Sequence, residues 1–192
     1  MPSCAAVLLL DLQVDFLDNV HGRMPVSPDG ALRVVAAANE VLEGRVLAGA
    51  LPVLVVNKFP VAARVANYFR HGAAVAGSPG AELDPRIRAA SGIRVFPKDR
   101  ADAFTNLALE PYLREEGFEK LWILGVFAEG CIRATALSAR RRGFEVEVPQ
   151  AEIATNSSWK VAFALWALRR GGVTIIPNVR AAASEGESLS VP

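Results

Sequence analysis

The sequence predicts an α/β protein built around a parallel sheet, and three observations support this fold class. Short apolar runs alternate with longer segments of helical periodicity, which is the pattern of βαβ units. Hydrophobic residues make up 52% of the 192 residues, as expected when a sheet is covered on both faces. No internal repeat or break in composition divides the sequence. We therefore expect one three-layer, Rossmann-like domain over residues 1–183 and a disordered tail over residues 184–192.

The expected strands are the short apolar runs. They occupy residues 5–11, 52–57, 93–97, 120–126, 144–148 and 173–176 and form a six-stranded parallel sheet. A doubly wound arrangement places them in the order 3-2-1-4-5-6, with helices on both faces. Right-handed crossovers bring the carboxyl ends of the strands to one edge of the sheet. Ligands bind at that edge in this class of fold.

The expected helices lie between the strands, at residues 30–49, 105–117, 130–142 and 158–170, with a shorter helix at 81–90. Glycine follows two of these segments, at Gly143 and Gly171, as it often does at helix ends. Asn156 and Ser157 are candidates to cap the last helix. Residues 58–92 are the least regular part of the sequence, and so long an excursion between strands is usually functional or mobile.

Charge and composition exclude several classes of partner. The net charge is +1, from 21 basic and 20 acidic side chains, so no bulk field favours nucleic acid or an anionic membrane. No apolar run approaches the roughly 20 residues of a membrane-spanning helix, and residues 1–4 do not resemble a signal peptide. The two cysteines are too few for a disulfide framework. We therefore expect a cytoplasmic protein that acts on a small molecule.

Cys131 is the first candidate for a catalytic residue. It follows the strand at residues 120–126 and lies at the start of the helix at 130–142. The first N–H groups of a helix carry the positive end of its dipole. A thiol held there is expected to ionise more easily and to act as a nucleophile at neutral pH. The alternative is a small buried cysteine of the core.

Two further polar residues follow strands in the same way. Asp11 ends the first strand and Lys98 follows the third. An aspartate there can take the thiol proton as a general base, while a lysine stabilises the resulting charges. The structural alternatives are a turn cap for Asp11 and a surface pairing with Asp99 or Asp102 for Lys98. The convergence of all three side chains on one edge favours a catalytic site.

Three segments resemble the motifs of the isochorismatase-like cysteine hydrolases, which include nicotinamidases, N-carbamoyl amidohydrolases and ureidoacrylate amidohydrolases. Residues 11–16 (Asp-Leu-Gln-Val-Asp-Phe) are similar to the opening D-x-Q-x-D-F of that family. Residues 98–104 are similar to its K-x-x-x-[SD]-A-F, and residues 125–131 to its nucleophile segment. The motifs occur in order, and the resemblance runs from about residue 5 to residue 177.

The resemblance implies a catalytic triad of Cys131, Asp11 and Lys98 that attacks a carbonyl carbon and passes through a thioester. It also implies a cis peptide at Val126–Phe127. The backbone N–H groups of Phe127 and Cys131 are then expected to form the oxyanion hole. Losing one such donor typically lowers the rate by about 10²–10³-fold.

The sequence departs from the nicotinamidases at the residues that hold their metal. Those enzymes carry an Asp-x-His pair after the second strand and a later histidine. Here the pair is replaced by Asn57 and Phe59, and His71 is the sole imidazole nearby. One histidine without a carboxylate is not a zinc-type site. We therefore predict no metal and no other cofactor, and we argue against nicotinamidase activity.

The substrate pocket is expected to be lined by four aromatic side chains and one amide: Phe16, Asn57, Phe59, Phe104 and Phe127. Such a lining indicates a small, partly apolar substrate without a strong anionic group. The nearest candidates to bind a carboxylate are the three arginines Arg64, Arg70 and Arg100, because a guanidinium offers two parallel N–H donors.

The leading functional hypothesis is hydrolysis of a C–N bond in a linear amide or carbamoyl compound. One alternative is isochorismatase-type hydrolysis of an enol ether, which needs acid help from Asp11 but no thiol. Another is a non-catalytic member of the fold. Neither a G-x-G-x-x-G after the first strand nor a Walker A motif is present. Trp159 and Trp166 share one helix face, which fits a core position or an interface, and we expect a homodimer or homotetramer.

Overall fold

Seven parallel strands form one sheet in the computed structural model, which describes residues 4–47 and 49–181. The strands are β1 (Cys4–Leu10), β2 (Leu51–Asn57), β3 (Arg94–Lys98), β4 (Phe118–Val126), β5 (Glu145–Pro149), β6 (Ile153–Ala154) and β7 (Thr174–Ile176). Their order is β3-β2-β1-β4-β5-β7, and β6 pairs with β4. The predicted fold class and strand order are confirmed, because the sixth predicted strand is β7. The two-residue strand β6 was not predicted.

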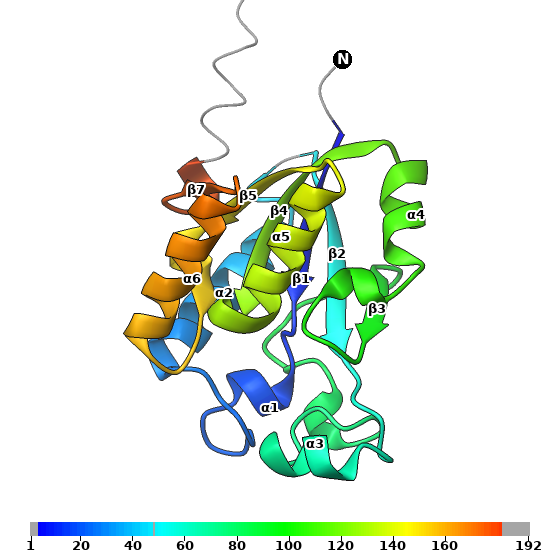
Figure 1. Cartoon of the computed structure of the whole chain (residues 1–192), viewed down its shortest axis with the longest axis vertical. Helices are drawn as coiled ribbons and strands as arrows, with labels where there is room; N and C mark the ends of the chain where they lie inside the picture. The colour runs from blue at the N-terminus through cyan, green and yellow to red at the C-terminus, as the bar shows by residue number, and fades with distance from the viewer. Residues whose placement is uncertain (1–3, 48, 182–192) are drawn as a thin grey trace, which may run out of the picture.

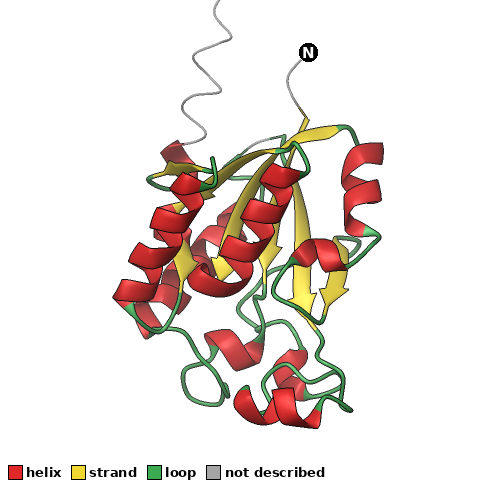
Figure 2. Cartoon of the chain, viewed as in Figure 1, coloured by secondary structure: helices red, strands yellow, loops and turns green. Residues whose placement is uncertain are grey.

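Helices cover both faces of the sheet (Figures 1 and 2). The α-helices of the described residues are α1 (Val14–Leu17), α2 (Pro28–Leu42), α3 (Arg64–Phe69), α4 (Leu109–Glu115), α5 (Arg133–Arg141) and α6 (Ser158–Arg170). The helices α1 and α3 lie beyond the carboxyl ends of the strands, and the others cover the faces of the sheet (Figure 1). The central strand β1 divides its side chains between the two layers, since alternate residues of a strand point to opposite faces. Val7 and Leu9 pack with α2, whereas Leu8 and Leu10 pack in the cluster that contains α4, α5 and α6.

The predicted helices differ from the observed ones mainly at their ends. The helix at 158–170 has the predicted bounds as α6. The helix expected at 130–142 is a π-helical turn, η3 (Ala128–Ile132), continued by α5. The helix α2 begins two residues before the predicted start because Ser27 caps it, accepting the N–H of Gly30, and Pro28 occupies the first turn.

The helix predicted at residues 81–90 is wrong. Pro85 has no backbone N–H and disfavours helical backbone at the residue before it. A side chain of α2 satisfies the backbone there instead. Asn39 donates to the carbonyl oxygen of Arg86 at 2.9 Å and accepts the backbone N–H of Arg88 at 2.8 Å. The segment is therefore an irregular loop that is bound to α2.

The long connection between β2 and β3 lies with α1 beyond the carboxyl ends of the strands (Figure 1). It contains α3 and the short turn η1 (Pro79–Ala81). Two isolated β-bridges hold its backbone in place, one between Phe59 and Val75 and one between Gln13 and Leu83. This connection therefore forms one wall of the edge where ligands are expected.

Three other predictions concern the outside of the molecule. The predicted tail at residues 184–192 lies outside the described residues. Within residues 4–47 and 49–181, no helix is both long and apolar enough to cross a bilayer. Trp159 and Trp166 of α6 are 67% and 56% exposed, so they do not belong to the core of the single chain. A homo-oligomer stays a prediction.

Candidate active site

Asp11, Lys98 and Cys131 meet at the carboxyl edge of the sheet. Asp11 directly follows β1, Lys98 is the last residue of β3, and Cys131 lies in the turn η3 after β4. The ammonium nitrogen Nζ of Lys98 lies 3.0 Å from Oδ2 of Asp11 and 3.2 Å from Sγ of Cys131. The structure thus brings together three side chains that are up to 120 residues apart in sequence.

Asn57, at the end of β2, completes the surroundings of the Lys98 ammonium group. Its Oδ1 accepts a hydrogen bond from Nζ of Lys98 at 2.8 Å, and its Nδ2 lies 3.9 Å from Sγ of Cys131. A lysine ammonium has three donors, and here all three are used by Asp11, Asn57 and Cys131. The four side chains are buried, so this set of contacts is shielded from water.

The backbone around Asp11 is held in an uncommon conformation. Asp11 has a φ of 60°, a region that few residues other than glycine adopt. Such a conformation persists where the surroundings hold it. Here the backbone N–H of Asp11 donates to the carbonyl oxygen of Val55 at 2.8 Å. The carboxylate is therefore positioned by β2 as well as by its own strand.

Gln13 joins the ends of β1 and β2 to the turn η1. Its Nε2 donates to the carbonyl oxygens of Asn57 (2.7 Å) and Ala81 (2.6 Å), and its Oε1 accepts the backbone N–H of Asn57 (2.8 Å). The sequence motif contains Gln13 but does not indicate its role. Its bonds fix the backbone of Asn57 and, through it, the partner of Lys98.

Asp15, the second aspartate of the same motif, orders the loops around the pocket. Its Oδ2 accepts the backbone N–H of Ala74 at 2.8 Å, and its Oδ1 accepts that of Arg23 at 3.2 Å. A side chain at Gly80 would come within 2.0 Å of the Asp15 carboxylate, so only glycine fits there. Asp15 therefore connects α1 to the long connection between β2 and β3.

The expectation of an ionised thiol at neutral pH is wrong. Burial, reinforced by the negative charge of Asp11, raises the pKa of the Cys131 thiol to about 12, and the opposing charge of Lys98 does not offset these effects. A thiolate is costly where water is excluded. The expected helix start is the π-helical turn η3. The buried sulfur of Cys131 faces the Asp11 carboxylate there, and this negative charge disfavours a thiolate. Cys131 is thus a neutral thiol in the resting protein.

The pKa values of Asp11 and Lys98, the other two groups of the triad, suit a proton transfer to Asp11. Burial raises the pKa of the Asp11 carboxyl above its usual value, although Lys98 opposes the effect. Burial alone would lower the pKa of Lys98, but the charge of Asp11 and the hydrogen bonds to Asp11 and Cys131 outweigh it, and the pKa is raised. Oδ1 of Asp11 is buried and has no hydrogen-bond partner among the described residues. It is therefore free to receive a proton.

A cavity of about 300 Å³ opens over Cys131. Its lining comprises Phe16, Met24, Asn57, Phe59, Arg70, Ala101, Phe127, Glu129, Gly130, Cys131, Asn156 and Lys160. Four of the five predicted substrate-binding residues are among these. Of the three candidate arginines, Arg70 lines the cavity, whereas Arg64 and Arg100 do not.

Phe104 is the predicted pocket residue that the structure places elsewhere. It is buried in the core, where its ring stacks on that of Phe144 with centroids 6.0 Å apart. Asp102 accepts the backbone N–H of Phe104 at 2.9 Å and starts the short turn η2 (Ala103–Thr105). The guanidinium of Arg142 lies 4.7 Å from the ring centroid. The Phe104 side chain thus supports the sheet and does not reach the cavity.

Three polar residues that line the cavity, Glu129, Asn156 and Lys160, were not predicted as site residues. Lys160 lies with its Nζ 3.3 Å from Oε1 of Glu129 and 2.9 Å from Oδ1 of Asn156. The hydroxyl of Thr155 also donates to Oε1 of Glu129 at 3.0 Å. Thr155 and Asn156 directly follow β6, at the carboxyl end of a strand, where polar residues often form sites. They could not be recognised from the sequence, because a strand of two residues leaves no apolar run that marks its position.

The peptide between Val126 and Phe127 is cis, as the family resemblance implied. Among the hydrogen bonds of the described residues, none is donated by the backbone N–H of Phe127. The ring of Phe127 meets that of Phe16 edge to face, with centroids 5.4 Å apart.

Gly125, two residues before Phe127, lies close to the backbone of β1. A side chain at Gly125 would approach the Leu10 carbonyl oxygen to 2.2 Å. The close pairing of β1 and β4 therefore requires glycine there.

The residues at the position of the nicotinamidase metal do not fit a metal ion. Oδ1 of Asn57 is occupied by the Lys98 ammonium at 2.8 Å. Phe59 has no donor atom, and His71 is exposed and does not line the cavity. Within residues 4–47 and 49–181, no group of three or more His, Cys, Asp or Glu side chains is arranged to hold a metal ion.

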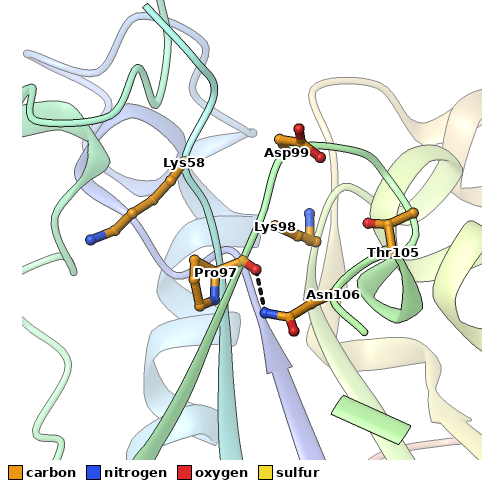
Figure 3. Close-up of a pocket in the computed structure, with 6 residues that line it drawn as sticks. All are labelled: Lys58, Pro97, Lys98, Asp99, Thr105 and Asn106. Carbon is orange, nitrogen blue, oxygen red and sulfur yellow. Dashed lines mark hydrogen bonds between the residues drawn. The ribbon is translucent and has the colours of Figure 1, made fainter. Parts of the chain in front are cut away.

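A second depression, of about 280 Å³, lies at the carboxyl ends of β2 and β3 (Figure 3). It is lined by Lys58, Pro97, Lys98, Asp99, Thr105 and Asn106. The Nδ2 of Asn106 donates to the carbonyl oxygen of Pro97 at 2.7 Å. The Lys98 ammonium is engaged by Asp11, Asn57 and Cys131, so it is not free for a ligand in this depression. The cavity over Cys131 is therefore the candidate active site.

Comparisons with known proteins agree on one family. Streptothricin hydrolase of Streptomyces noursei is 33% identical over 150 residues, covering 78% of this chain and 54% of that protein. N-carbamoylsarcosine amidase of an Arthrobacter species is 37% identical over 78 residues, covering 41% of this chain and 30% of that protein. The chain thus spans at most about half the length of these curated relatives.

The solved structures extend this similarity over the whole fold. The crystal structure of an isochorismatase family protein from Desulfovibrio vulgaris matches with a TM-score of 0.80 at 25% identity, over 97% of this chain and 99% of that chain. The model of the Isochorismatase domain matches residues 5–178. Because this match spans most of the sequence and all three segments of the site, the chain belongs to the Isochorismatase family.

Proposed function

We propose that this chain is a hydrolase that cleaves the C–N bond of a small linear amide or carbamoyl compound. Cys131 acts as the nucleophile, Asp11 as the general base and Lys98 as the group that stabilises their charges. The observation that carries the proposal is the buried ammonium of Lys98, which contacts both the Asp11 carboxylate and the Cys131 sulfur at the cavity. A lysine with a purely structural role would be satisfied by the Asp11 carboxylate, whereas Lys98 also contacts the thiol of Cys131.

The proposed first half-reaction begins from a neutral thiol. As Sγ of Cys131 bonds to the carbonyl carbon, its proton passes to the Asp11 carboxylate, whose raised pKa makes it the better acceptor. The carbonyl oxygen becomes an oxyanion, and we assign its stabilisation to the backbone N–H groups of Phe127 and Cys131. Asp11 then gives the proton to the leaving nitrogen, the C–N bond breaks, and a thioester remains.

The second half-reaction regenerates the thiol. Asp11 takes a proton from a water molecule as the oxygen of that water attacks the thioester carbon. The C–S bond breaks, the sulfur recovers the proton, and the acid is released. Throughout both halves, the Lys98 ammonium stays protonated because its pKa is raised, and it offsets the negative charge that moves between oxygen and sulfur.

The relatives favour an amide over an enol ether as the substrate. One of them is named an amidase and another a hydrolase, and both match segments of this chain at more than 30% identity. Isochorismatase-type cleavage stays the second candidate, because a carboxyl group with a raised pKa also suits an acid that donates to an enol ether. The two candidates differ in their need for the thiol.

Replacing Cys131 by alanine is the variant that tests the proposal. We expect wild-type protein to release ammonia from one or more members of a panel of small amides, ureides and carbamoyl compounds. The alanine variant is expected to lose this activity by at least about 10³-fold, since removal of a nucleophile abolishes its pathway. Replacing Cys4, the other cysteine, by alanine should leave the activity unchanged.

Two results would contradict the proposal. If the Cys131→Ala variant kept wild-type ammonia release, Cys131 would not be the nucleophile. If both proteins released pyruvate from isochorismate at the same rate and neither released ammonia from the panel, the second candidate would replace the first. Circular dichroism of the variant should match that of the wild type, so that loss of activity is not loss of fold.

A further inference from the structure

The charged side chains around the cavity leave one positive charge without a partner. Among the described residues that line it, the charged side chains are Arg70, Glu129 and Lys160. Lys160 and Glu129 form an ion pair at 3.3 Å, so their charges offset each other. The guanidinium of Arg70 makes no hydrogen bond or ion pair with a described residue, and its contact is the face of Phe59, 3.9 Å from the ring centroid.

The catalytic groups add no net charge to this balance. Asp11 and Lys98 are paired at 3.0 Å, and both are buried. The thiol of Cys131 is neutral, because its pKa is raised to about 12. The cavity and the groups beneath it therefore carry a net charge of one positive unit, and that unit lies on Arg70. A ligand with one negative charge would complete the balance.

Arg70 is held in place before any ligand arrives. It is the C-cap residue of α3, where its backbone N–H donates to the carbonyl oxygens of Ala66 and Asn67, and its own carbonyl oxygen accepts the N–H of Ala73 at 2.9 Å. The Phe59 ring beneath the guanidinium is buried, and the backbone N–H of Phe59 donates to the carbonyl oxygen of Ala74 at 2.9 Å. A cation held in this way loses little conformational freedom on binding.

We infer that the substrate carries a carboxylate in addition to its scissile amide, and that Arg70 binds this carboxylate. The inference rests on the proposed function and narrows its substrate class to amides of small acids. A guanidinium stacked on a ring keeps its edge N–H donors free, and these fit the two oxygens of a carboxylate. This replaces the expectation of a substrate without an anionic group.

Neither of the other cations is as well suited. Lys160 is already engaged by Glu129 and Asn156, so binding a second anion there would break an existing pair. Arg64 is the first residue of α3, the helix that Arg70 caps, but it is exposed and does not line the cavity. Arg64 thus provides a matched control, since its replacement changes the net charge of α3 without changing the cavity.

The test compares probes that differ only in charge. Succinamate and glutaramate are amides with a free carboxylate, and succinamide and glutaramide carry a second amide instead. Binding of each is measured by calorimetry in the Cys131→Ala background, so that turnover is not needed. Ammonia release is measured in parallel in proteins that retain Cys131. We expect the anionic probe of at least one pair to bind at least about 10-fold more tightly than its neutral partner, as for a hydrogen bond to a charged group.

Replacing Arg70 by methionine should remove this preference. The affinity for the anionic probe is expected to fall by about 10–100-fold, and this loss should exceed any change in the affinity for the neutral probe. Arg64→Met should keep the wild-type preference. The inference is overturned if Arg70→Met keeps the preference, or if no anionic probe binds more tightly than its neutral partner. Ammonia release that survives Cys131→Ala would instead overturn the proposed function, and the calorimetry would still decide the role of Arg70.

Discussion

Replacing Asp11 by asparagine is expected to lower kcat for amide hydrolysis by about 10³–10⁴-fold, in the upper part of the range for a general base. The amide keeps the size of the side chain and can still accept from Lys98, but it cannot take the thiol proton. Because the pKa of Cys131 is about 12, very little thiolate forms at neutral pH without that base. Steady-state kinetics at neutral pH measure the loss.

The pH profile distinguishes a base from a merely structural aspartate. Burial raises the pKa of the Asp11 carboxyl above its usual range, and the carboxylate is the active form. The acidic limb of kcat/KM should therefore rise with pH through a value above the pKa of an ordinary aspartate, followed by a plateau across neutral pH. Asp99→Asn, at an exposed neighbour of Lys98, should leave kcat and this limb unchanged. An Asp11→Asn variant within tenfold of wild-type kcat would contradict the assignment.

Replacing Lys98 by methionine is expected to lower the free energy of unfolding by about 3–5 kcal/mol, as when one partner of a buried ion pair is removed. The Asp11 carboxylate would be left buried without its cation. The pKa of Asp11 would rise further, and a protein that contains a buried acid with a raised pKa becomes less stable as pH increases. The difference in the free energy of unfolding between variant and wild type should therefore grow between acidic and neutral pH. Urea unfolding measured at both pH values gives the result.

Two controls accompany this variant. Lys58→Met, at an exposed lysine next to Asn57, is expected to change stability by no more than about 0.5 kcal/mol. The double variant Asp11→Asn, Lys98→Met removes both charges and should be more stable than Lys98→Met alone, since the uncompensated charge is gone. Equal stability of the single and double variants would show that the ion pair is not what stabilises the site.

The strand order and the triad could be predicted from the sequence because both depend on local pattern. The apolar runs locate the strands, and the handedness of crossovers then fixes which ends share an edge. Asp11, Lys98 and Cys131 each follow such a run, so their meeting at one edge requires no knowledge of side-chain packing. The same reasoning missed Thr155 and Asn156, because β6 has only two residues.

Features that depend on packing could not be predicted. The orientation of Phe104 is set by its contacts with Phe144 and Arg142, which are distant in sequence. Arg70 could not be distinguished from Arg64, because the structure of the long connection decides which of them faces the cavity. The sign of the Cys131 pKa shift depends on how completely the sulfur is buried, and a sequence motif does not encode that burial.

The central claim is that Cys131 carries the acyl or carbamoyl group of the substrate during turnover. It is tested by rapid acid quench of wild-type protein with a hydrolysed amide, followed by intact mass spectrometry and peptide mapping. We expect an adduct with the mass of that group on the peptide that contains Cys131, which disappears when the quench is delayed until the substrate is consumed. An adduct on another residue, or full turnover in a Cys131→Ala variant, would contradict the claim.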